Sequence, residues 1–280
     1  MNNTIDILMI TYNRPEYTAL ALRRLLDSCD ETMRVWVWHN GNHQPTLDVV
    51  SALRDHPRMH RFHHSAENRK LTGPTNWVWT EGDGRYVSKV DDDMLVPDGW
   101  AQTLRQLLID DKRVGCISCW HYPPEDLRPE LAQKKIRTLR GGHRILMHPW
   151  IGGSGYLMRR KCVKQEGLLT EGESFPRYIE RTAWRAWING WYYPFIYSEH
   201  MDDPRAEHTL LKCDADIADH LPLTAQRNGV TSLDEWTELI RETAVHVQSA
   251  GVRPGKYFLL RSLLYRAGLR AAARPRSQAS

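Results

Sequence analysis

Three adjacent carboxylates, Asp91, Asp92 and Asp93, are the residues of this sequence with the most definite chemistry. They directly follow a strand-like pattern at residues 85–90, and a helix-like segment begins near Asp98. Neighbouring carboxylates repel one another, so holding three of them at a strand end is unfavourable unless a cation neutralises them. Ligands of open α/β sheets bind just beyond the carboxyl ends of the strands, and hard divalent ions prefer oxygen ligands. The triad therefore predicts a divalent-metal site, with a solvated acidic turn as the alternative.

The chain has 280 residues, and strand and helix patterns alternate through its first half. Strand patterns cover residues 5–10, 35–38, 59–63, 85–90 and 114–120, and helical patterns cover residues 15–28, 46–53, 75–81 and 101–109. This order is typical of a parallel sheet with crossover helices. We therefore expect an α/β fold with a mostly parallel sheet flanked by helices.

The second half of the chain is less regular. Prolines, glycines and basic residues alternate over residues 121–148, which predicts a long irregular insertion. A further strand is expected after residues 150–156, then a helix at 178–188 that is closed by a turn at Asn189-Gly190. A strand at 192–197 and helices at 233–249 and 256–273 follow. The prediction is a domain at residues 1–215, followed by a C-terminal helical, basic extension at residues 216–280.

The formal charge of +4 is distributed unevenly along the sequence. Residues 251–280 contain seven Lys or Arg and no Asp or Glu, so residues 1–250 carry a charge of −3 by difference (+4 − 7). In the last predicted helix, leucines such as Leu260 and Leu263 form an apolar stripe beside arginines such as Arg261 and Arg266. We expect the stripe to dock and the basic face to be solvated, with contact to an anionic membrane or to nucleic acid as alternatives.

The amino-acid composition also indicates where in the cell the protein is located. No stretch approaches the 18 or more apolar residues of a membrane span, and the first residues lack the basic and apolar regions of a signal peptide. Five cysteines, a sparse and odd set, are typical of reduced thiols. We expect a cytoplasmic protein, with peripheral membrane contact through the basic C-terminal segment as a further possibility.

The loops distinguish this sheet from other phosphate-binding folds. The first strand-to-helix turn, residues 11–16, contains neither GxGxxG nor GxxxxGK[ST], which disfavours a dinucleotide-binding domain and a P-loop NTPase. It also differs from the glycine-rich opening loop of sugar-1-phosphate nucleotidyltransferases. The glycine-rich residues 152–155 lie late in the chain, where a tight turn explains them as well as a phosphate does.

Five segments, in order, resemble glycosyltransferase family 2, the large inverting group with the GT-A fold. They are ILMITYNRPE at residues 7–16, VWVWHNGN at residues 35–42, NRKLTG at residues 68–73 with Asn76, the Asp triad in the place of the DxD motif, and Arg185, Gly190, Pro194 and His200 in the spacing R-x4-G-x3-P-x5-H. The resemblance covers roughly residues 5–203 and implies the GT-A fold and a nucleoside-diphosphate sugar as donor.

The resemblance also implies roles for individual residues. Asp91, Asp93 and His200 would hold Mn²⁺ or Mg²⁺, and a nitrogen ligand from His200 would favour manganese. The donor nucleotide and its phosphates would lie against a set of residues from the first three motifs and the triad, namely Thr11, Asn13, Arg14, His39, Asn40, Lys70, Asp91 and Asp92.

The sequence departs from the family pattern at two points. His39 stands where the family usually has an Asp that contacts the nucleotide base. Tyr178 and Ile179 stand where the family has a Glu-Asp pair, so the general base must come from elsewhere. Glu180, one position later, is our first candidate for the base, and Glu173 on the preceding loop is the second.

The sequence therefore predicts a metal-dependent inverting glycosyltransferase that acts on a glycan, a lipid-linked or another hydroxyl acceptor. Three alternatives stay open at this point. They are a family member that binds a sugar nucleotide or glycan without catalysis, a sugar-1-phosphate nucleotidyltransferase, and a glycosyltransferase that acts on modified viral DNA.

Overall fold

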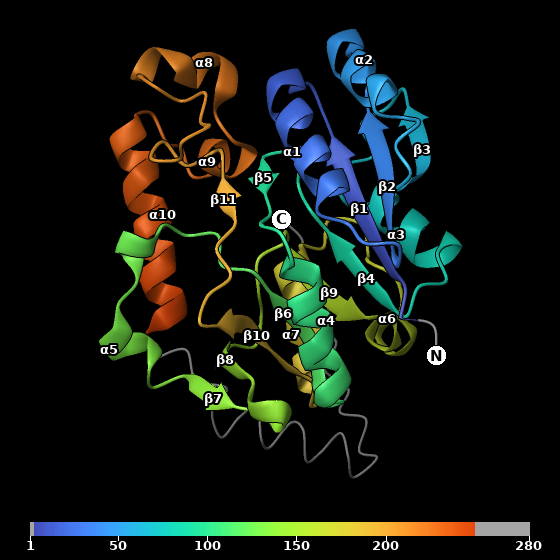
Figure 1. Ribbon diagram of the computed structural model, residues 1–280. Coiled ribbons are helices and arrows are strands. Elements are labelled where there is room, and N and C mark those ends of the chain that lie inside the picture. The colour runs from blue at the N-terminus through green and yellow to red at the C-terminus, as the bar shows by residue number, and fades with distance from the viewer. Residues whose placement is uncertain (1–2, 250–280) are drawn as a thin grey trace.

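A computed structural model describes residues 3–249 of the chain (Figure 1). Its centre is a sheet of nine described strands in the order β3-β2-β1-β4-β9-β6-β10-β8-β7. The bounds of these strands are β1 Ile5–Thr11, β2 Met33–Asn40, β3 Met59–Ser65, β4 Tyr86–Lys89, β6 Val114–Ser118, β7 Ile136–Thr138, β8 Arg144–Met147, β9 Tyr156–Arg159 and β10 Ile188–Tyr193. A separate two-stranded sheet pairs β5, Met94–Leu95, with β11, Glu199–His200.

Strands β1, β2, β3 and β4 pair with one another in parallel, as the alternation predicts. The sheet as a whole is mixed, because β9 runs antiparallel between β4 and β6, and β8 runs antiparallel beside β10. β1 shows the two-sided burial of a central strand: Ile7 and Met9 face one apolar cluster, and Leu8 faces another with Trp36.

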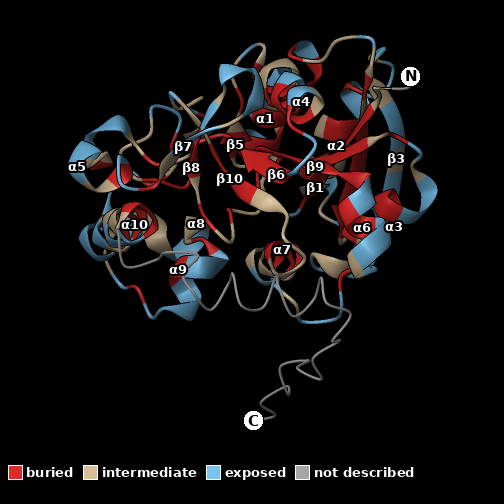
Figure 2. Ribbon diagram, turned by 90° about the horizontal axis from the view of Figure 1, so that it is seen from below, coloured by how far each residue is buried: buried red, intermediate tan, exposed pale blue. Residues whose placement is uncertain are grey.

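Helices cover both faces of the sheet, as the view from below shows (Figure 2). One face carries the helices that share the first core cluster: α1 Pro15–Asp27, α2 Gln44–Ala52 and α4 Trp100–Asp110. The other face carries the helices that contribute to the second cluster: α3 Thr72–Glu81, α6 Arg160–Glu166, α7 Phe175–Trp184, α9 Leu223–Arg227 and α10 Leu233–Gln248. The remaining helices, α5 Pro129–Ala132 and α8 Ile217–His220, are single turns, as are the 3₁₀ segments Pro124–Asp126, Arg140–Gly142 and Asp214–Asp216.

The prediction of an irregular insertion at residues 121–148 is wrong in part. β7 and β8 form an antiparallel pair that extends the sheet beyond β10. Gly141 and Gly142 lie between them with φ of 74° and 78°, a left-handed conformation that glycine adopts without strain. Strands of three and four residues are too short to give a periodic signal, which is why the pattern predicts a loop.

The boundary between α7 and β10 also differs from the prediction. The helix ends at Trp184 and the strand begins at Ile188, so Asn189-Gly190 lies inside β10 and does not form a turn. The buried Asn189 side chain accepts a hydrogen bond from Cys116 N at 3.1 Å and donates one to Thr182 Oγ1 at 3.0 Å. Asn189 thus joins β6, α7 and β10, a tertiary role that its local sequence does not reveal.

Gly190→Ala is expected to lower the stability of the fold. A Cβ at Gly190 would lie 2.3 Å from the carbonyl oxygen of Leu146 on β8, which is backbone and cannot turn aside. Overpacking of this kind destabilises by about 1–3 kcal/mol, and we expect the upper end of that range. Thermal unfolding followed by circular dichroism measures the effect. Gly153→Ala is the control, because its nearest neighbour would be Phe175 Cβ at 3.7 Å; an equal loss in both variants would contradict the explanation.

α10 docks on the insertion through its C-terminal turn. Gln248 accepts a hydrogen bond from Arg128 N at 2.7 Å, and the buried Lys135 donates to the carbonyl oxygen of Val247 at 2.6 Å. Burial lowers the pKa of Lys135 to about 8. The helix predicted at residues 256–273 lies outside the described residues. Within residues 3–249, no helix combines the length and the apolar character needed to cross a membrane.

Candidate active site

The carboxyl ends of β2, β1 and β4 lie side by side in the sheet. Because these strands are parallel, the residues that follow them meet at one edge: His39 and Asn40 from β2, Thr11 from β1, and the Asp triad after β4. Three of the motifs that are separate in the sequence therefore form one site. This is the edge at which ligands bind in open α/β folds.

The two-stranded sheet brings His200 to the triad. β5 begins directly after Asp93 and pairs with β11, so that His200 lies opposite Met94. The backbone N–H of Met201 also donates to the carbonyl oxygen of Asp93 at 2.8 Å. These backbone contacts fix the distance between two segments that are far apart in the sequence.

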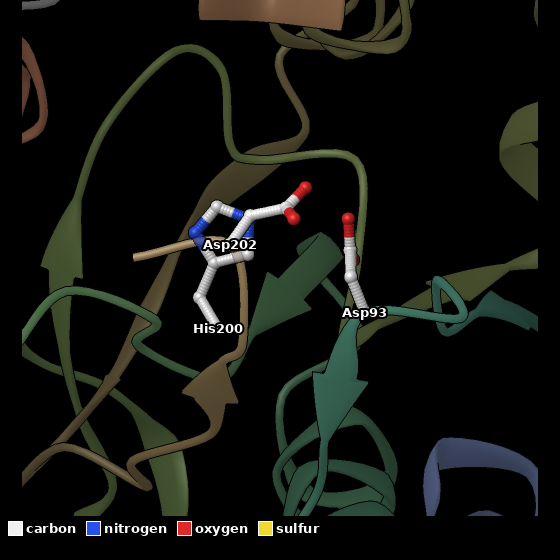
Figure 3. Close-up of side chains that lie close together, drawn as sticks. All are labelled: Asp93, His200 and Asp202. Atoms are coloured by element: carbon white, nitrogen blue, oxygen red, sulfur yellow. The ribbon is translucent and has the colours of Figure 1, made fainter. Parts of the chain in front are cut away.

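Asp93, His200 and Asp202 offer ligand atoms that all lie within 4.8 Å of one another (Figure 3). In Figure 3 the three side chains come from the two paired segments and converge on one space. Two carboxylates and an imidazole suit a divalent ion such as Mn²⁺, which accepts both oxygen and nitrogen ligands. The sequence prediction omits Asp202, although its position two residues after the motif histidine is a signal that could have found it.

Arg14 reaches into this group of three. Its guanidinium donates to Asp93 Oδ2 at 3.2 Å and to both carboxylate oxygens of Asp202 at 2.6 and 2.9 Å. The sequence assigns Arg14 to the nucleotide, whereas here it contacts the candidate metal ligands. Burial opposes ionisation of Asp93, but His200 and Arg14 outweigh it and hold the pKa of Asp93 below its usual value.

Asp91 and Asp92 face different neighbours. Asp91 forms an ion pair with the buried Lys89, and its backbone N–H donates to Ser154 Oγ at 2.8 Å. Asp92 is buried and accepts hydrogen bonds from Tyr12 N at 3.2 Å and from Thr18 Oγ1 at 3.4 Å. Asp92 therefore ties the triad to the turn after β1. Burial, followed by the negative charge of Asp93, raises the pKa of Asp92.

His39 is a fully buried and neutral side chain. Its Nδ1 is 2.9 Å from Thr11 Oγ1, and within the described part of the chain its Nε2 has no hydrogen-bond partner. Burial, with smaller contributions from His64 and His43, lowers the pKa of His39 to about 4. A neutral, buried imidazole with one unpaired nitrogen therefore lies beside the end of β1.

Asn40 organises the loop that carries Lys70. Its Oδ1 accepts hydrogen bonds from Arg69 N and Trp38 Nε1, both at 2.9 Å, and its Nδ2 donates to the carbonyl oxygen of Lys70 at 3.3 Å. Lys70 is exposed, with a positive φ of 52°. Asn13, also exposed, has a φ of 53° in the turn after β1. The residues predicted to contact the nucleotide thus form two groups. His39 and Asn40 belong to a buried layer, and Asn13 and Lys70 form an exposed rim.

The glycine-rich residues 152–155 border the triad. Besides the bond from Asp91 N to Ser154, Gly155 N donates to the carbonyl oxygen of Lys89 at 2.9 Å. A Cβ at Gly152 would lie 2.9 Å from Cε1 of His121, whose ring centroid is 5.9 Å from that of His200. The glycines therefore allow close packing beside the candidate metal ligands. His121 is a second residue of this region that the sequence prediction omits.

The candidate general bases belong to α7 and the loop before it. Tyr178 and Ile179, at the family's Glu-Asp positions, are fully buried in the core. Glu173 is held by Arg181 at 3.0 Å and by Thr170, which donates to its carboxylate at 3.0 and 3.2 Å. Glu180 is half-buried on α7, and no side chain or backbone group of the described residues pairs with its carboxylate. The carboxylate of Glu173 is thus already paired, whereas that of Glu180 is unpaired among the described residues.

The structure thus places an Asp-His-Asp group at the carboxyl ends of parallel strands, where ligands bind in open α/β folds. The model of the family described as glycosyl transferase family 2 matches residues 6–165, more than half of the chain. The chain therefore belongs to glycosyltransferase family 2 and is a glycosyltransferase. The match includes the Asp triad and ends before α7 and His200.

Solved structures support the same fold. The mannosyltransferase PcManGT from Pyrobaculum calidifontis, in complex with GDP-Man and Mn²⁺, is 16% identical with a TM-score of 0.55, covering 98% of this chain and 82% of its own. TarS 1–349 from S. aureus, in complex with UDP, is 12% identical with a TM-score of 0.51, covering 95% of this chain and 92% of its own. At this identity the similarity establishes the GT-A fold alone. No curated protein matches the chain significantly.

Proposed function

We propose that this protein transfers a sugar from a nucleoside-diphosphate sugar to a hydroxyl group of an acceptor, with inversion at the anomeric carbon and with the help of Mn²⁺ or Mg²⁺. The observation that carries the proposal is the meeting of Asp93, His200 and Asp202 at the carboxyl end of β4. The ligands named for the two solved structures, GDP-Man with Mn²⁺ and UDP, support this type of donor.

The metal would be held by Asp93, His200 and Asp202. When bound, a divalent ion supplies Lewis acidity that stabilises the negative charge of a departing diphosphate. Asp91 is held by contacts with Lys89 and Ser154. It would therefore contact the metal through a bound water, or would contact the ribose of the nucleotide instead. The imidazole of His200 favours manganese over magnesium, because magnesium prefers oxygen ligands.

The nucleotide would lie over the ends of β1 and β2. His39, whose Nε2 is buried and unpaired, would lie beside the base, and Thr11 holds the ring of His39 in place. Asn13 and Lys70 on the exposed rim would contact ribose and phosphate, and Asn40 would act by holding the Lys70 loop. In this proposal, a neutral imidazole takes the place that the family gives to a carboxylate.

Glu180 is the proposed general base. A base must be free to accept the proton of the acceptor hydroxyl as the bond to the sugar forms. The carboxylate of Glu173 is already bonded to Arg181 and Thr170, whereas that of Glu180 has no partner among residues 3–249. This difference supports the order of the two candidates that the sequence alone suggests.

A panel of UDP-, GDP- and dTDP-sugars, each with and without Mn²⁺, tests the proposed function by thermal shift. Ligand at 100 times its Kd stabilises the folded state by about 2.7 kcal/mol, a rise in Tm of several degrees. We expect one nucleotide class to stabilise the protein, and Mn²⁺ to increase the effect. Mn²⁺-dependent hydrolysis of that donor separates an enzyme from a protein that only binds it. Absence of a shift with every nucleotide would contradict the proposal.

The acceptor is proposed to be a glycan, a lipid-linked hydroxyl or another hydroxyl compound. The basic residues 251–280, which lie outside the described residues, would bind an anionic membrane or nucleic acid that carries the acceptor. Replacement of Arg261, Arg266 and Arg270 by Glu should weaken binding to anionic vesicles, which itself should fall as salt rises. Co-sedimentation with anionic and with zwitterionic vesicles measures this. Loss of donor binding in a folded variant would instead place this segment in the active site.

A further inference from the structure

The guanidinium of Arg14 lies where a metal ion would bind. It contacts Oδ2 of Asp93 and both carboxylate oxygens of Asp202, at distances between 2.6 and 3.2 Å. These are two of the three side chains whose ligand atoms form the candidate metal group. An intramolecular cation therefore uses the carboxylate oxygens that a divalent ion would need.

This contact is part of the fold and differs from a surface ion pair. The side chain of Asp202 is 3% exposed and that of Arg14 is 23% exposed. Trp236 on α10 donates its Nε1–H to the carbonyl oxygen of Asp202 at 2.7 Å, and Arg14 also donates to the carbonyl oxygen of His220 at 3.4 Å. Exposed ion pairs contribute little because water screens them, whereas this pair is largely removed from water.

Electrostatics favours one cation in this space at a time. Without a metal, Arg14 balances the two carboxylates, which would otherwise face one another at close range. A divalent ion bound to the same oxygens would lie close to the guanidinium, and like charges repel strongly where water is excluded. The long side chain of Arg14 can leave by rotation about its own bonds without a change in the backbone.

We propose that Asp202 completes, with Asp93 and His200, the divalent-ion site of this enzyme, and that the guanidinium of Arg14 occupies this site until the ion displaces it. The inference rests on the proposed function for the presence of a metal. To the metal site of the proposed function it adds a competing cation, Arg14, and with it a test of Asp202 as a ligand. Because the ion binds only the fraction of molecules in which Arg14 has moved away, the apparent affinity of the wild-type protein is reduced by that fraction.

Titration with Mn²⁺ alone, in the absence of nucleotide, tests the competition. We expect Arg14→Gln to bind Mn²⁺ about 10-fold or more tightly than the wild type in isothermal titration calorimetry, since the site no longer holds a guanidinium. The matched control is Arg23→Gln, which makes the same charge change within α1, the helix that begins directly after Arg14. Arg23 is exposed and has no partner within residues 3–249, so its replacement should leave the affinity unchanged within about twofold.

The double variant Arg14→Gln/Asp202→Asn tests the role of Asp202. Its affinity for Mn²⁺ should fall below that of Arg14→Gln, because the charged carboxylate of Asp202 becomes a neutral amide of the same size. Electron paramagnetic resonance of the bound Mn²⁺ gives a second readout that is independent of transfer activity. Arg14→Lys serves as a second variant in case Arg14→Gln does not fold. Lysine keeps the positive charge but cannot make two parallel hydrogen bonds to a carboxylate, so this variant should bind Mn²⁺ with intermediate affinity.

Two results would overturn the inference. One is equal Mn²⁺ affinity of the wild type, Arg14→Gln and Arg14→Lys; the other is a double variant that binds as tightly as Arg14→Gln. Failure of the proposed function can be distinguished from failure of this inference. The proposed function is tested by binding of UDP, GDP and their sugars, whereas this inference is tested by binding of Mn²⁺ alone. A protein that shows the expected Mn²⁺ series but binds no nucleotide would retain this site and lose the proposed reaction.

Discussion

Asp93→Ala is expected to abolish sugar transfer and to leave the fold intact. Asp93 belongs to the candidate metal group and contacts Arg14. A metal that stabilises a departing diphosphate contributes several kcal/mol to the transition state, so its loss should reduce kcat by about 10³-fold or more. Donor turnover and the Mn²⁺ dependence of donor binding are the measurements.

The fold of Asp93→Ala should survive for two reasons. Arg14 keeps both of its hydrogen bonds to Asp202, and the backbone contact from Met201 N to residue 93 does not depend on the side chain. Removal of one carboxylate also relieves repulsion within the triad. Asp98→Ala is the matched control, because Asp98 is an exposed acid a few residues further along the chain. Donor binding by Asp93→Ala with unchanged metal dependence would remove Asp93 from the metal site.

The part of the site that the sequence predicts is the part that local pattern encodes. The triad, the turn at residues 11–16 and the end of β2 each follow a strand with a clear apolar pattern, and parallel pairing brings strand ends together. The order of motifs then gives the family and the GT-A fold. Each of these inferences needs only neighbours in sequence and one rule of topology.

The parts that the sequence misses depend on long-range contacts. Asp202 becomes a partner of Asp93 only because two residues of β5 pair with two residues of β11, which is too short a pairing to leave a periodic signal. Its contact with Arg14 joins that pairing to the turn before α1. Likewise Asn189-Gly190 has the composition of a turn, and tertiary hydrogen bonds from Asn189 hold it in a strand. Contacts between residues far apart in the sequence, and not residue type, decide these cases.

Glu180→Gln is expected to reduce turnover by about 10²-fold or more while donor affinity stays near that of the wild type. A positioned proton acceptor contributes a factor of this size, and an amide of nearly the same shape cannot accept the proton. Glu180 is half-buried on α7 and has no partner among the described residues, so its replacement breaks no ion pair or hydrogen bond that holds the fold. Steady-state kinetics with donor and acceptor, and donor binding by calorimetry, separate the two effects.

Glu173→Gln is the matched comparison, because it makes the same chemical change on the loop before α7. Glu173 is bonded to Arg181 and to Thr170, so its replacement should lower the thermal stability more than Glu180→Gln does and affect turnover less. The opposite result, in which Glu180→Gln keeps most of its activity and Glu173→Gln loses it, would place the general base on the loop. Arg181 would then have to release Glu173 during the reaction, and Arg181→Gln should raise the turnover of an enzyme with that base. If Glu180 is the base, Arg181→Gln leaves turnover nearly unchanged, so this third variant distinguishes the two assignments independently.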